Sequence, residues 1–353
     1  MMRERPDTAA AVTERLAGDD APTVHVDRRA GADRRERLFG ILQRSGALIM
    51  LVITLVTGAA AFGTSFTSPD NLIDTVAAGS AFLAIVAVGM TFVIISGGID
   101  LSVGAVLAMS AVLTAYCAAE YGPVAGIVVP LAASALVGLA QGLLISRVAL
   151  PAFIVTLAGM QLARGVAFKV TDEGNKTVLI PPDSWLRDLG SGAILGVPIP
   201  VVIALATFAV GGIVLNRSRS GQAVFAIGGS EDAAPLMGLP VRRVKTSLYV
   251  WSALLAGVAG VLIAARSSTG EPTAGYGLEL QAIAAVVIGG TLLTGGYGTM
   301  SGTLAGVSLL AVIQNLINQL GTLSQYFQDV VSGAFLLAVV LLQQILARRR
   351  RLQ

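Results

Sequence analysis

Residues 81–117, AFLAIVAVGMTFVIISGGIDLSVGAVLAMSAVLTAYC, decide the fold class of this chain. Two long apolar runs are separated here by only five residues, Ser96 to Asp100. Crossing the hydrocarbon core of a bilayer as a helix takes roughly 20 apolar residues, and each run approaches that length. We therefore interpret the stretch as two transmembrane helices joined by a short link.

The composition of the whole chain supports this interpretation. The 353 residues are 54% hydrophobic and only 13% charged, whereas a soluble domain carries about 25% charged residues. The 41 glycines suit helices whose backbones approach closely within a membrane. With one histidine, His25, and one cysteine, Cys117, neither a zinc cluster nor a Ser/His/Asp or Cys/His nucleophile can be assembled. We expect an all-α integral membrane protein that is not an enzyme and that binds no cofactor or metal.

Similar apolar runs recur along the chain and predict about ten transmembrane helices. They lie near residues 46–64, 75–95, 101–119, 123–145, 150–169, 197–215, 246–265, 279–294, 298–320 and 327–346. Residues 1–44 are polar, charged and without an apolar period, which predicts a disordered cytoplasmic tail. Residues 45–347 then form the transmembrane domain, and residues 348–353 form a basic cytoplasmic tail.

The positive charges favour an even number of spans with both termini in the cytoplasm, because cytoplasmic loops are rich in Lys and Arg. Ten spans place one set of basic residues on one face: Arg28, Arg29, Arg34, Arg35, Arg37, Arg44, Arg147, Arg217, Arg219, Arg242, Arg243, Lys245 and Arg348 to Arg351. The opposite face receives Asp70, Asp74, Glu120, Asp172, Glu173, Asp183, Asp188 and Glu271. Acids interleave with the tail arginines, so we expect contact with lipid and not with nucleic acid.

A faint internal repeat suggests two pseudo-repeated halves. Residues 84–104 align without gaps on residues 282–302, with seven identical positions that include Gly97/Gly295, Gly98/Gly296 and Gly104/Gly302. Transporters are often built from such halves, with Gly-rich broken helices at their interface. Two spans of similar composition could also match by chance.

The link Ser96-Gly97-Gly98-Ile99-Asp100-Leu101-Ser102-Val103-Gly104 is the most informative segment. An aspartate at a helix centre costs about 2.5–3.5 kcal/mol on insertion scales, so such a residue normally faces a cavity or a partner. One interpretation is a gate or pathway element. The other is a tight cytoplasmic turn in which Asp100 or Ser102 caps the next helix.

The loop 216–245 is the longest predicted cytoplasmic connection and contains a candidate short helix. Ser230 would be its N-cap, Glu231 and Asp232 would lie at its positive end, and Gly238 would close it. Leu236, Met237 and Leu239 give the segment an apolar edge outside the membrane. Such an edge suggests docking to a partner protein, although it could also lie on the membrane surface.

Two further features are a loop on the predicted outer side and a charged residue inside an apolar run. Residues 266–281 are polar and turn-rich, and either line a substrate entrance or form an ordinary loop. Arg164 lies within an apolar run and needs an internal partner. No G-x-x-x-x-G-K-[ST] phosphate loop occurs, so any ATPase must be a separate chain.

In this order, the segments resemble the permease subunits of bacterial ABC importers for ribose and related monosaccharides. The family shows G-G-[IV]-D-L-S-V-G, matched by Gly97 to Gly104, and G-G-N-E-x-A-A-x-x-x-G-[IV], resembled by Gly228 to Leu239. Pro272 to Thr291 match a later stretch of the family, P-x-x-G-x-G-x-E-L-x-A-I-A-A-V-V-[IL]-G-G-T. Ser230 replaces the usual Asn, and Gln281 stands where an acid is common.

The resemblance implies a permease in the bacterial inner membrane that works with ATP-binding cassette subunits, a periplasmic or lipid-anchored sugar-binding protein and a second permease copy. It implies that Ser230, Glu231, Asp232, Ala233, Ala234 and Gly238 couple to the ATPase. It also directs attention to the translocation path, where we place Gly97, Gly98, Asp100, Ser102, Gly104, Glu279, Gly295 and Gly296. The alternative hypothesis is an ion-coupled secondary transporter with Asp100 as its coupling site.

Overall fold

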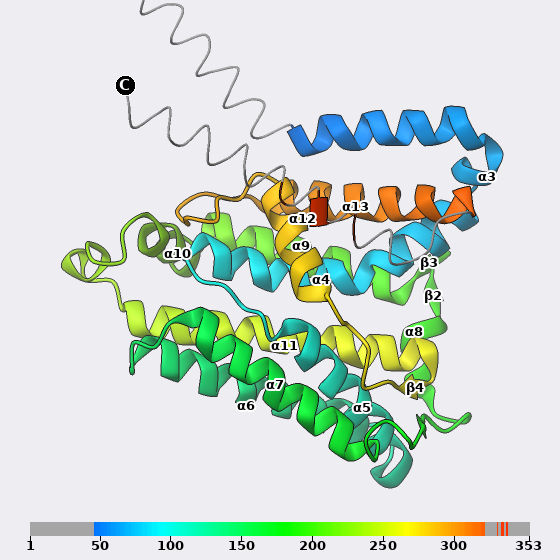
Figure 1. The fold of residues 1–353 in the computed structure, drawn as a ribbon, viewed down its shortest axis with the longest axis horizontal. Coiled ribbons are helices and arrows are strands. Elements are labelled where there is room, and N and C mark those ends of the chain that lie inside the picture. The colour runs from blue at the N-terminus through cyan, green and yellow to red at the C-terminus, as the bar shows by residue number, and fades with distance from the viewer. Residues whose placement is uncertain (1–45, 322–329, 331–332, 335–336, 338–353) are drawn as a thin grey trace, which may run out of the picture. The chain divides into compact units, whose positions relative to one another are not determined.

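The computed structural model describes residues 46–321 together with residues 330, 333–334 and 337, and this part of the chain is almost entirely helical (Figure 1). The longer helices are Gly46–Phe62, α4 (Ala78–Ile95), α5 (Val103–Tyr121), α6 (Ala125–Ser146), α7 (Ala152–Val170), α9 (Ile199–Arg217), α10 (Arg219–Gly229), α11 (Val241–Ser267), α12 (Leu278–Ile288) and α13 (Met300–Leu320). The shorter ones are α3 (Thr64–Thr67), η1 (Asp70–Ala77), η2 (Trp185–Arg187), α8 (Asp188–Ser191) and η3 (Ala234–Met237).

Each of the first nine predicted spans coincides with an apolar helix. Seven of these helices are long and apolar enough to cross a membrane, the first of them running continuously from Asp70 to Ile95. Helices Gly46–Phe62 and α12 are apolar but shorter. Most of the tenth predicted span and both tails lie outside the described residues, so ten crossings with cytoplasmic termini stay a prediction. The structure therefore confirms an all-helical protein with seven candidate spans.

Helix α11 is the central element of the bundle and packs against α4, α5 and α6. Its contact with α6 depends on glycines: a Cβ atom on Gly138 or Gly142 would overlap the α11 backbone near Tyr249 or Thr246. Small residues allow this approach, as expected for helices that pack without a hydrophobic driving force. The buried residues around this contact are mainly Ala, Val, Ile and Leu.

Helix α5 begins halfway along α11 instead of at its end. Asp100, before α5, bonds to Ser252, and a Cβ on Gly260 would meet Leu107, so the two helices run in the same direction. Ser252 lies eleven residues after the start of α11, which is about 17 Å along the axis. The link 96–102 therefore descends from the end of α4 into the interior, as Figure 1 shows.

Helix α12 is too short to cross the hydrocarbon core of a bilayer by itself. Its 11 residues span about 16 Å, roughly half of the hydrocarbon thickness. Strand β4 (Thr269–Gly270), which pairs antiparallel with β1 (Val178–Leu179), precedes it, and residues 271–277 connect the two. Strands β2 (Ala193–Ile194) and β3 (Val197–Pro198) form a second small hairpin. Backbone without regular secondary structure at membrane depth has to be buried in protein or line a cavity. The link before α5 and the segment before α12 are therefore candidates for a functional site.

The loop 216–245 differs in part from its prediction. Helix α10 occupies its first half and was not expected; Ser218 caps it by accepting a hydrogen bond from the Gly221 N–H at 3.0 Å. The expected short helix is a single 3₁₀ turn, η3, because Pro235 lies within its first residues and removes a donor. Gly238 ends it in the left-handed conformation, as predicted (φ 76°).

Candidate transport site and coupling segment

Three glycine pairs distant in sequence meet at one point, which we call the glycine junction: Gly97-Gly98, Gly228-Gly229 and Gly295-Gly296. The Gly296 N–H donates to the Ile95 carbonyl at 2.8 Å. A Cβ on Gly228 would overlap that same carbonyl oxygen, and a Cβ on Gly295 would lie 2.9 Å from the Gly97 nitrogen. The backbone after α4, the last residues of α10 and the backbone after α12 therefore touch without intervening side chains.

The segment 230–238, which we call the coupling segment, follows the glycine junction directly. Ser230 is not a helix N-cap, but its hydroxyl accepts a hydrogen bond from the Ala233 N–H at 3.3 Å. Ala234 is buried, whereas Leu236 and Met237 are 89% and 63% exposed. The apolar edge predicted from the sequence thus faces outward.

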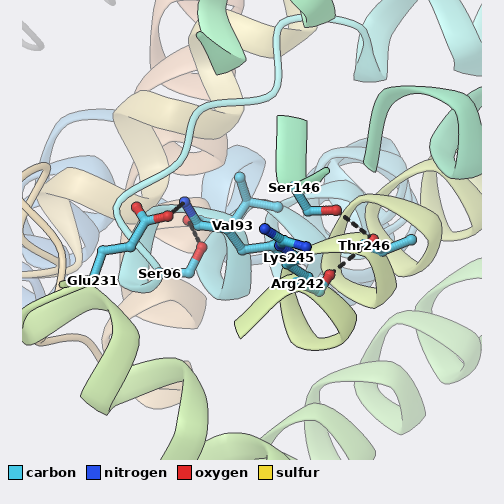
Figure 2. A network of polar contacts seen from close by, with 7 residues as sticks. All are labelled: Val93, Ser96, Ser146, Glu231, Arg242, Lys245 and Thr246. Atoms are coloured by element: carbon cyan, nitrogen blue, oxygen red, sulfur yellow. Dashed lines mark hydrogen bonds and ion pairs between the residues drawn. The ribbon is translucent and has the colours of Figure 1, made fainter. Parts of the chain in front are cut away.

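Glu231 ties the coupling segment to helix α11. Its carboxylate lies 2.5 Å from the ammonium group of Lys245, whose side chain is only 14% exposed. Figure 2 shows this pair close to Ser96, whose hydroxyl donates to the Val93 carbonyl at 2.7 Å at the end of α4. The coupling segment is therefore tied to the start of α11, close to the end of α4.

Asp100 is fully buried at the lower end of that link and accepts three hydrogen bonds. Oδ1 accepts from the N–H and the hydroxyl of Ser102 at 2.9 and 2.7 Å, and Oδ2 accepts from the Ser252 hydroxyl at 2.8 Å. The link is therefore not an exposed surface turn, although the Asp100 carboxylate does accept the Ser102 N–H immediately before α5, as the capping interpretation predicted. The Ser102 hydroxyl also lies 3.3 Å from Gln141 Oε1 of α6, so Asp100 and Ser102 together connect the start of α5 with α6 and α11.

A second polar group lies beside the start of α5. Arg164 of α7 donates to the carbonyls of Pro272 and Ala274 at 2.6 and 2.9 Å, and its guanidinium stacks 4.0 Å from the ring centre of Tyr276. These contacts supply the partner that its burial requires. Glu279 interacts electrostatically with the same guanidinium. Residues 272–276 are therefore held against α7, and their role at a substrate entrance stays a prediction.

The predicted site residues fall into two groups. A Cβ on Gly104 would overlap the Gly275 carbonyl and approach Glu279, so Gly104 and Glu279 belong with Arg164 at the start of α5. Gly97, Gly295 and Gly296 belong to the glycine junction. Gly98, also part of the junction, is packed against the Tyr249 hydroxyl.

Three participants were not predicted: Ser252, Gln141 and the pair Gly228-Gly229 as junction residues. Ser252 and Gln141 lie within apolar helices, where a single polar residue does not reveal its partner. The adjacent glycines at 228–229 repeat the doublets at 97–98 and 295–296. The repeated glycine doublet is the feature of the sequence from which the junction could have been predicted.

The fold and the site define a class: a polytopic membrane protein with broken helices, a polar interior and an exposed segment fixed to the broken ends. Residues 72–340 match the family described as branched-chain amino acid transport system / permease component. The chain belongs to this family, and its curated relatives are permeases of ABC transporters.

Several relatives match over nearly their full length. The ribose import permease protein of Bacillus subtilis (strain 168) is 38% identical over 88% of this chain and 96% of its own. The L-arabinose ABC transporter permease protein of Azospirillum brasilense is 36% identical over 91% and 94%. The ribose import permease protein of Escherichia coli (strain K12) is 38% identical over 85% and 93%. No solved structure matches the chain.

Proposed function

We propose that this chain is the membrane-spanning subunit of an ATP-driven importer for a monosaccharide or related small polar solute. The substrate class rests on relatives named for ribose and L-arabinose. Its partners are ATP-binding cassette subunits on the cytoplasmic side, a sugar-binding protein on the outer side, a second permease copy and membrane lipid. The chain itself hydrolyses no ATP and binds no cofactor.

The observation that carries this proposal is the continuity between the coupling segment and the glycine junction. An ATPase that docks on Leu236 and Met237 would push on residues bonded to α11 and adjacent to the ends of α4 and α12. From the end of α4, the link 96–102 reaches Asp100. Helix α12 begins beside Arg164 and the start of α5. A displacement at the surface is thereby transmitted to the interior by backbone contacts, and docking biases a two-state element.

The coupling segment gives the first test. We expect Leu236→Asp to abolish co-purification of an ATP-binding cassette subunit after gentle solubilisation, because it places a charge on the most exposed apolar side chain of the segment. Glu231→Arg and Gly238→Trp should abolish uptake of labelled sugar with membrane insertion intact. The first change sets two cations together, and the second forces a bulky side chain into a left-handed position.

Leu195→Asp is the matched control, since Leu195 is 99% exposed on the turn between β2 and β3, far along the chain from the coupling segment. It should retain both the ATPase subunit and uptake. If Leu236→Asp also retains both, the coupling role of residues 230–238 is wrong, whereas transport by the intact chain alone would exclude the ATP-driven importer.

Asp100 gives a second test. We expect Asp100→Asn to keep most of the uptake, because an amide can still join the hydroxyls of Ser102 and Ser252. Asp100→Leu should abolish it, since each buried group left without a partner costs about 1–3 kcal/mol. Uptake rates normalised to the amount of protein in the membrane distinguish the two. Complete loss in Asp100→Asn would instead indicate that the carboxylate itself has to ionise or bind a cation.

A further inference from the structure

A groove on the outside of the bundle, between α6 and α11, has two chemically different ends. Its volume is about 610 Å³. One end is basic and is formed by Arg147, which follows α6, and by Arg242 and Arg243 in the first turn of α11. The other end is apolar and includes Leu139, Leu143 and Trp251.

The contacts between α6 and α11 fix the two ends of the groove relative to each other. At the basic end, the hydroxyls of Ser146 and Thr246 lie 2.8 Å apart, and Thr246 also donates to the Arg242 carbonyl at 2.9 Å (Figure 2). Trp251 lies eight residues beyond Arg243 in α11, which is about 12 Å deeper along the helix axis. A cationic cluster thus lies at the start of α11. The apolar part of the groove extends from it along one to two turns of the helices.

The cationic cluster has no acidic partner among the residues that the structure describes, where the only ion pair is Lys245–Glu231. All three arginines are exposed, as is Trp251, at 61%. The start of α11 adds further positive potential, because its N-cap is Pro240, which provides no side-chain oxygen to the first N–H groups. An anion is therefore the complementary ligand at this end, and an alkyl chain is the complement at the other.

We propose that the groove between α6 and α11 is a binding site for an anionic phospholipid, with the phosphate group at Arg147, Arg242 and Arg243 and an acyl chain along Leu139, Leu143 and Trp251. Basic pockets between membrane helices on the cytoplasmic side suit such headgroups. The positive-inside orientation predicted from the sequence places the arginines at that surface. The site lies on α11, the helix that also carries Lys245 and Ser252, so its occupant is positioned to stabilise the helix to which the coupling segment and Asp100 are bonded.

Trp251 allows a direct test in the full-length protein. The chain has two tryptophans, so Trp185→Phe leaves Trp251 as the only one. This variant is reconstituted in phosphatidylcholine vesicles that contain increasing fractions of phosphatidylglycerol brominated on its acyl chains, and fluorescence quenching is recorded. Quenching should be half-complete at a much lower fraction of brominated phosphatidylglycerol than of brominated phosphatidylcholine.

Adding Arg242→Gln and Arg243→Gln should remove this preference, with affinity falling about fivefold for each arginine. The matched control is Arg217→Gln with Arg219→Gln, which removes the same charge outside the groove and should leave the preference unchanged. Equal quenching by the two lipids before any arginine is changed would overturn the proposal, as would a preference lost equally in the control. No quenching by either lipid would mean that protein covers the groove, and would also overturn it. None of these outcomes depends on the transported solute.

Discussion

Replacing Gly228 by alanine should reduce uptake strongly, whereas the same change at Gly229 should leave uptake near normal. A Cβ on Gly228 overlaps the Ile95 carbonyl and lies 2.5 Å from the Gly296 nitrogen, so it disrupts the hydrogen bond between them. A Cβ on Gly229 meets nothing within 4 Å. Overpacking of this kind costs about 1–3 kcal/mol. A bias of about 2 kcal/mol between two conformations changes their ratio roughly thirtyfold.

The measurement is the initial rate of labelled sugar uptake, normalised to the amount of permease in the membrane and accompanied by ATPase activity of the purified complex. We expect Gly228→Ala to retain ATP hydrolysis while losing uptake, because in the proposed importer the ATPase site is on another chain and only the transmission is broken. Normal uptake in Gly228→Ala would show that the three backbones separate during transport, and the glycine junction would then not be the transmitting contact.

Arg164→Leu should also abolish uptake, through a different mechanism. The change leaves the carbonyls of Pro272 and Ala274 without their donor. Residues 272–276 should then detach from α7. The matched control is Arg266→Leu, because Arg266 makes only an exposed hydrogen bond to the Asp74 carbonyl at 3.3 Å; it should transport normally.

Movement of residues 272–276 can be measured apart from transport. Cys117 is the only cysteine, so Cys117→Ala with Ala274→Cys provides a single thiol in this segment, at a partly buried residue packed against the core. An impermeant maleimide added from the outer side should label it faster when Arg164→Leu is present. Unchanged labelling together with normal uptake would mean that Arg164 does not hold the segment in place.

Much of the architecture follows from local sequence. Runs of apolar residues located nine helices, and Gly238 was recognised as the end of its turn because left-handed backbone favours glycine. The family resemblance rested on short motifs and is confirmed by relatives that align over most of the chain. These features depend on residues close together in the sequence.

The parts that were missed depend on long-range packing. Nothing near Arg164 in the sequence indicates that its partners are the backbone carbonyls of Pro272 and Ala274, because a carbonyl is present at every residue. The depth of Asp100 was also hidden, since a five-residue link between apolar runs resembles a surface turn. Helix α10 was overlooked because its Gly-rich, partly polar sequence lacks a long apolar run.

The pairing of Arg164 has a consequence for biosynthesis. Its acceptor at Pro272 lies 108 residues later in the chain, and a ribosome adds about 5–20 residues per second. Helix α7 is thus complete roughly 5–20 seconds before the carbonyls that accept hydrogen bonds from its arginine have been made. During that interval the helix has no internal partner for its charge, so the insertion machinery or a chaperone has to shelter it from lipid. Slowing translation between codons 170 and 272 should therefore increase degradation of the newly made chain, and Arg164→Leu should remove that sensitivity.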